Sequence, residues 1–86
     1  MKYNESTSME PHLLEEIRVL LDDTTVKYWT GVDNSIPKAR LRGICTAIHA
    51  YTGEIWAVKP DEQKRYTLVN EDETECITPH KPYCAL

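Results

Sequence analysis

The stretch from Leu41 to Val58, LRGICTAIHAYTGEIWAV, constrains the fold of this chain more than any other. Two apolar runs rich in Ile, Val, Thr and aromatic residues meet at Tyr51-Thr52-Gly53-Glu54. A glycine at this point can adopt the positive φ that a short hairpin loop with a bulge requires. The pattern therefore predicts a β-hairpin, with its long first strand bent at Gly43 because glycine bends a strand at little steric cost.

The rest of the chain predicts one helix and several more strands. Apolar residues at helical spacing between Leu13 and Leu21 indicate an amphipathic helix, capped by Ser8 and ending near Asp22-Asp23, where Thr24-Thr25-Val26 favours an extended chain. Residues 1–7 are polar and aperiodic, as expected of a flexible arm. We expect strands at about 24–30, 40–51, 54–58, 65–69 and 75–78, with a tail after Pro79.

These elements predict an α+β domain in which the N-terminal helix packs on a small, strongly bent, five-stranded antiparallel barrel. A chain of 86 residues has room for one domain with a modest core. The expected division is a flexible arm at 1–7, a single barrel domain at 8–79 and a tail at 80–86.

The order of these elements resembles that of Sm-like and SH3-like barrels, and two bacterial families in particular. The helix LLEEIRVLL, the strand VKYWTG and the bent strand LRGICTAIHAY are similar to the elements of the RNA chaperone Hfq. The segments RGICTAI, TGEIWAV, KPDEQKRYTLV and EDETECITP resemble more closely the Rof family of Rho-termination inhibitors, over roughly residues 13–79. The resemblance implies an inhibitor of transcription termination that binds the helicase Rho and blocks RNA at its primary binding site.

The charges of the chain suit a protein that binds a basic partner. Fourteen acids against ten Lys and Arg give a formal net charge of −4, which argues against a general electrostatic grip on nucleic acid. Complementary charge raises the association rate and selects the partner. A solvated acidic surface is the alternative interpretation. The candidate partner-binding residues are the acids of the helix and of one later turn: Glu10, Glu15, Glu16, Asp22, Asp23, Glu71, Asp72 and Glu73.

Direct RNA binding is the second hypothesis. Lys38, Arg40 and Arg42 alternate, so on an extended chain they project from one face, where Trp29 could stack a base. Charges that protect an edge strand from aggregation are the alternative interpretation of this basic band. A monomer favours the inhibitor and a hexameric or heptameric ring favours an Sm-like RNA binder. An interaction protein of a phage or other mobile element is a third possibility.

Cysteine and histidine residues raise the possibilities of a zinc site and of a nucleophile. Cys45-x3-His49 and Cys76-x3-His80-x3-Cys84 offer five soft or borderline ligands, but no CxxC knuckle is present. On a strand, Cys45 and His49 would lie about 13 Å apart, too far to share one ion. We expect no metal, no cofactor and no enzymatic activity. The absence of a long apolar run and of a secretory h-region, together with three cysteines, favours a cytoplasmic protein that does not enter membranes.

Overall fold

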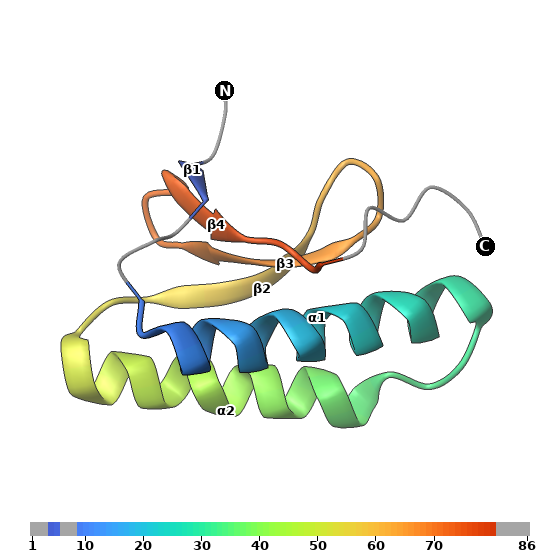
Figure 1. Cartoon of the computed structure of the whole chain (residues 1–86), viewed down its shortest axis with the longest axis horizontal. Helices are drawn as coiled ribbons and strands as arrows, with labels where there is room; N and C mark the ends of the chain where they lie inside the picture. The colour runs from blue at the N-terminus through green and yellow to red at the C-terminus, as the bar shows by residue number, and fades with distance from the viewer. Residues whose placement is uncertain (1–3, 6–8, 81–86) are drawn as a thin grey trace.

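Two antiparallel helices lie side by side against one face of a small sheet, giving two layers (Figure 1). The computed structural model describes residues 4–5 and 9–80, with side chains described for 9–80. Its helices are α1 (Pro11–Thr30) and α2 (Ser35–Thr52). Its strands are β1 (Asn4–Glu5), β2 (Trp56–Pro60), β3 (Tyr66–Asn70) and β4 (Glu75–Ile77).

The sheet is open and does not form a barrel. Its strand order is β1-β4-β3-β2, with β2, β3 and β4 antiparallel and the two-residue β1 parallel to β4. In register, Trp56 lies opposite Asn70, and Leu68 lies opposite Ile77. Within the described residues β1 and β2 are the two edges, and nothing joins them. The predicted five-stranded barrel is therefore wrong, whereas an α+β architecture is compatible with the structure.

Helix α1 continues through the segment that was expected to be a strand. Thr24, Thr25 and Val26 were expected to end the helix, but α1 reaches Thr30 and ends at Gly31, which has a φ of 75°. Two threonines are accommodated because their hydroxyl groups bond within the helix: Thr24 Oγ1 donates to the Leu20 carbonyl at 2.8 Å, and Thr30 Oγ1 donates to the Val26 carbonyl at 2.8 Å. The predicted strand at 24–30 is therefore wrong.

Helix α2 replaces the long bent strand of the predicted hairpin. Leu41 and Ile48 are buried and Ile44 and Cys45 are half-buried, which is helical spacing, so this apolar set also fits a period of 3.6 residues. Gly53 does have the expected positive φ, of 79°, but it ends a helix instead of turning a hairpin. Both conformations need a glycine with positive φ, so this residue could not distinguish them.

The later strands lie close to their predicted positions, and they form the core with the two helices. The buried cluster between the layers contains Ile17, Leu21, Leu41, Ile48, Trp56, Leu68 and Ile77. One polar contact fixes the helix layer on the sheet: the fully buried Thr25 accepts a hydrogen bond on Oγ1 from the backbone N–H of Tyr66, at 2.9 Å. The two-residue β1 lies in the segment that was expected to be a flexible arm.

Candidate interaction surfaces

Glu10 is a helix cap. It stands at the N-cap of α1, where its Oε1 accepts the Leu13 N–H at 2.9 Å and its Oε2 lies 2.8 Å from Nδ1 of His12. The backbone N–H of His12, its ring and the Leu13 N–H lower the pKa of Glu10. The structure thus gives Glu10 a local role that was assigned to Ser8, which lies outside the described residues.

The other acids of α1 lie on two sides of an exposed valine. At about 100° per residue, Val19 points away from the sheet, with Glu15 and Asp22 on one flank and Glu16 and Asp23 on the other. Glu15 Oε2 lies 3.0 Å from Nε2 of His80, so its flank faces the end of β4. Glu16 and Asp23 therefore lie on the flank nearer α2. Asp22 and Asp23 were expected at the end of the helix but lie inside it.

The acids of the turn between β3 and β4 lie apart from this group. Glu71, Asp72 and Glu73 follow β3 at the end of the molecule where α1 begins, away from Asp22 and Asp23 (Figure 1). Glu73 has a φ of 58° and binds Nζ of Lys59 at 2.8 Å. The eight predicted acids are therefore spread over α1 and one end of the sheet.

Lys38, Arg40 and Arg42 do not line up as they would on a strand. On α2, Lys38 and Arg42 lie on one side and Arg40 on nearly the opposite side, since residues two apart in a helix differ by about 200°. Nζ of Lys38 lies 5.6 Å above the ring of Tyr66. The indole of Trp29, on α1, donates to the Lys64 carbonyl at 3.1 Å. The structure does not bring these four residues together as one stacking and phosphate-binding band.

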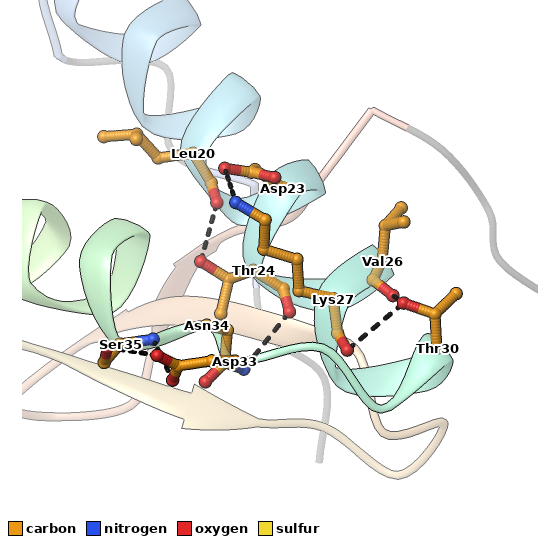
Figure 2. Close-up of polar contacts among 9 residues, drawn as sticks. All are labelled: Leu20, Asp23, Thr24, Val26, Lys27, Thr30, Asp33, Asn34 and Ser35. Carbon is orange, nitrogen blue, oxygen red and sulfur yellow. Dashed lines mark hydrogen bonds and ion pairs between the residues drawn. The ribbon is translucent and has the colours of Figure 1, made fainter.

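The connection between the helices is fixed by short polar contacts (Figure 2). Asp33 accepts from the backbone N–H and the hydroxyl of Ser35, at 3.1 and 3.0 Å. The amide of Asn34 donates to the Thr24 carbonyl at 3.3 Å, across to α1. These bonds set the register of the two helices, with Asn34 beside Thr24.

Cys45 and His49 become neighbours because they lie on a helix. One turn apart on α2, they border a shallow hollow with Thr46, Ile55 and Trp56. The 13 Å separation expected on a strand does not apply. Burial raises the pKa of the Cys45 thiol, which opposes the thiolate form that a nucleophile or metal ligand needs. Among the described residues, no three His, Cys, Asp or Glu side chains are grouped as metal ligands, and Cys84 lies outside them.

The face of the sheet opposite the helices carries a larger, open hollow of about 690 Å³. Thr67, Val69 and Cys76 form its floor, and the loop between β2 and β3 borders it. In that loop, Asp61 accepts from the backbone N–H of Arg65 and forms an ion pair with the Arg65 guanidinium at 2.9 Å. Three of the four charged residues that line the hollow, Lys59, Asp61 and Arg65, thus form ion pairs within the protein.

The outward face of the helix layer exposes large apolar side chains that the sequence interpretation missed. Val19 of α1 is 51% exposed, and Ile36 and Tyr51 of α2 are 67% and 90% exposed. Reading residues 35–52 as a helix is the signal that would have found Ile36, because it places this side chain about 120° to 140° around the helix from the buried Ile48 and Leu41. Tyr51 lies only about 60° to 80° from them and is exposed near the C-terminal end of α2.

No family model, curated protein or solved structure matches this chain. Within the part of the chain that the structure describes, neither helix is long and apolar enough to cross a membrane.

Proposed function

We propose that this protein is a non-enzymatic binding domain that docks a charged surface of another protein on the outward face of α1 and α2. One observation carries this proposal: this face combines exposed apolar side chains with unpaired charges of both signs. Glu16, Arg40 and Arg42 are exposed and form no ion pair within the described residues. Apolar anchors surrounded by charges are typical of protein interfaces.

The nature of the partner follows from charge. Glu16 lies on the flank of α1 that faces α2 and forms no ion pair among the described residues, so it favours a basic element of the partner. Asp23 lies on the same flank and binds Nζ of Lys27 at 3.3 Å. The candidate partner is Rho, which the resemblance to the Rof family implies. The acidic side of this face supports Rho as the partner. The thiol of Cys45, which forms no disulfide, supports a cytoplasmic site of action.

RNA binding through Lys38, Arg40, Arg42 and Trp29 receives less support. Two of the four side chains already have partners within the fold, Lys38 on Tyr66 and Trp29 on Lys64. Arg40 and Arg42 point to different sides of α2.

The experiment is affinity capture from a bacterial lysate, and separately with purified Rho, using the wild-type chain, the Glu16→Lys/Asp23→Lys variant and a control. The control is Glu62→Lys/Glu71→Lys, which makes the same charge change on exposed turns. We expect a partner that the wild type and the control retain and that the face variant loses by at least about tenfold. Identical capture by all three proteins would overturn the proposal.

A further inference from the structure

The two helices carry opposite charges on one continuous face. Helix α1 contains four acids and two bases, and α2 contains three bases and no acid. Among the described residues no ion pair joins the two helices, and the cations of α2 have no carboxylate partner. Glu16 of α1 and Arg40 and Arg42 of α2 are therefore the exposed charges that form no ion pair among the described residues, so this face offers both signs of charge to an incoming surface.

We propose that a second copy of this chain occupies this face, as a twofold dimer whose helices form a four-helix bundle between two sheets. The inference rests on the proposed binding role of this face, and it makes a second copy of the chain, in place of Rho, the protein that occupies it. A twofold axis that runs parallel to the helices, within the interface, places α1 of each copy over α2 of the other. A twofold axis across the helices would instead place α1 on α1 and α2 on α2, with like charges opposed.

The register of the helices identifies the pair of residues that meets. Asn34 lies beside Thr24 and the helices are antiparallel, so Arg40 lies about 9 Å further along, between the levels of Glu16 and Asp23. An axis parallel to the helices leaves these levels unchanged. Glu16 and Arg40 are both exposed on the outward half of their helix that faces the neighbouring helix. In the dimer, Glu16 of each copy therefore meets Arg40 of the other, twice.

The size of the face is sufficient for a reversible dimer. A helix of 20 residues is about 30 Å long, and two packed helices are about 20 Å wide, so each copy covers roughly 600 Å². The total of roughly 1,200 Å² lies at the lower end for specific interfaces. Val19 and Ile36 lie about one helical turn from Glu16 and Arg40, respectively, and supply apolar contact beside the charged pair. We expect a dimer that dissociates on dilution and at high salt.

The test is sedimentation velocity of the purified full chain at low salt over a concentration series. We expect the wild type and the Glu62→Lys control to dimerise, and Arg40→Glu and Glu16→Lys each to be monomeric, because each variant homodimer opposes two like-charged pairs. Mixing the two variants restores a dimer. In the mixed dimer, the unchanged Glu16 of the Arg40→Glu chain meets the unchanged Arg40 of the Glu16→Lys chain, which is the native pair. At the other contact the two substituted side chains meet, and their charges are also opposite. Circular dichroism confirms that each variant is folded.

Two results would overturn the inference: a wild type that stays monomeric up to about 1 mM, or variants that dimerise as well as the wild type. The wild type could be monomeric while still capturing another protein that the Glu16→Lys/Asp23→Lys variant does not capture. That result would contradict the dimer and leave the proposed function standing. If the wild type and both single variants dimerise equally, and all proteins capture the same partners to the same extent, both the dimer interface and the proposed function would be contradicted.

Discussion

The role of Glu10 could be assigned only once its neighbours in the structure were known. It was predicted as one of eight partner-binding acids, and its carboxylate instead binds the Leu13 N–H and His12 at the start of α1. The sequence correctly assigned four further acids to one helix: Glu15, Glu16, Asp22 and Asp23. It could not predict which of them face β4 and which face α2, because that depends on how the helix packs in the fold.

Glu10→Gln should lower the midpoint temperature of unfolding at pH 7. The folded state lowers the pKa of Glu10, so the stabilising effect of its charge is full above the pKa of the unfolded chain and is lost as pH falls through the lower, folded pKa. The gap between Glu10→Gln and wild type should therefore close in acid. Thermal melts from pH 7 to pH 2 measure it, with Glu62→Gln as the control. A gap that is unchanged at pH 2 would contradict the role of the charge.

Thr25→Val should destabilise the protein by about 1–3 kcal/mol, because it leaves the backbone N–H of Tyr66 without its acceptor while keeping the shape of the side chain. Thr30→Val, at the exposed end of the same helix, is the matched control and should change stability by less than about 0.5 kcal/mol. Urea unfolding measures both. Equal effects of the two variants would show that Thr25 does not anchor α1 to β3.

At the scale of elements, the strands after residue 54 were predictable and residues 24–52 were not. The C-terminal strands are short and are bounded by turn residues such as Asp61 and Asn70. In α2, by contrast, Ile44 and Ile48 fit both a strand of period 2 and a helix of period 3.6. The β-branched residues favoured the strand, and packing of Leu41 and Ile48 against the core overrode that preference.

Substitutions at two glycines of this region distinguish the observed helix from the predicted hairpin. Gly43 lies inside α2, with nothing within 4 Å of an added Cβ, so Gly43→Ala should stabilise the monomer by about 0.5–1 kcal/mol. Gly53 has a φ of 79°, and Gly53→Ala should cost about 1 kcal/mol. Urea unfolding at concentrations below dimerisation compares the two. A loss of stability for Gly43→Ala would indicate the bent strand instead.

At the scale of the whole molecule, one error in secondary structure changed the architecture. Reading residues 40–51 as a strand closed a barrel and placed Lys38, Arg40 and Arg42 on one face; as a helix, the same residues complete a layer and separate Arg40 from the other two. The predicted acidity of α1 survives this change, because it depends on sequence alone. The exposed apolar side chains of the helix layer become visible only once the second helix is recognised.

The conformation of residues 35–52 is the claim on which the helix layer and both proposals depend, and backbone NMR tests it most directly. The structure predicts a continuous run of positive Cα secondary shifts from Ser35 to Thr52, with sequential amide–amide NOEs. Negative Cα shifts over this segment, with Hα–Hα NOEs from residues 41–51 to residues 54–58, would contradict the account and restore the hairpin.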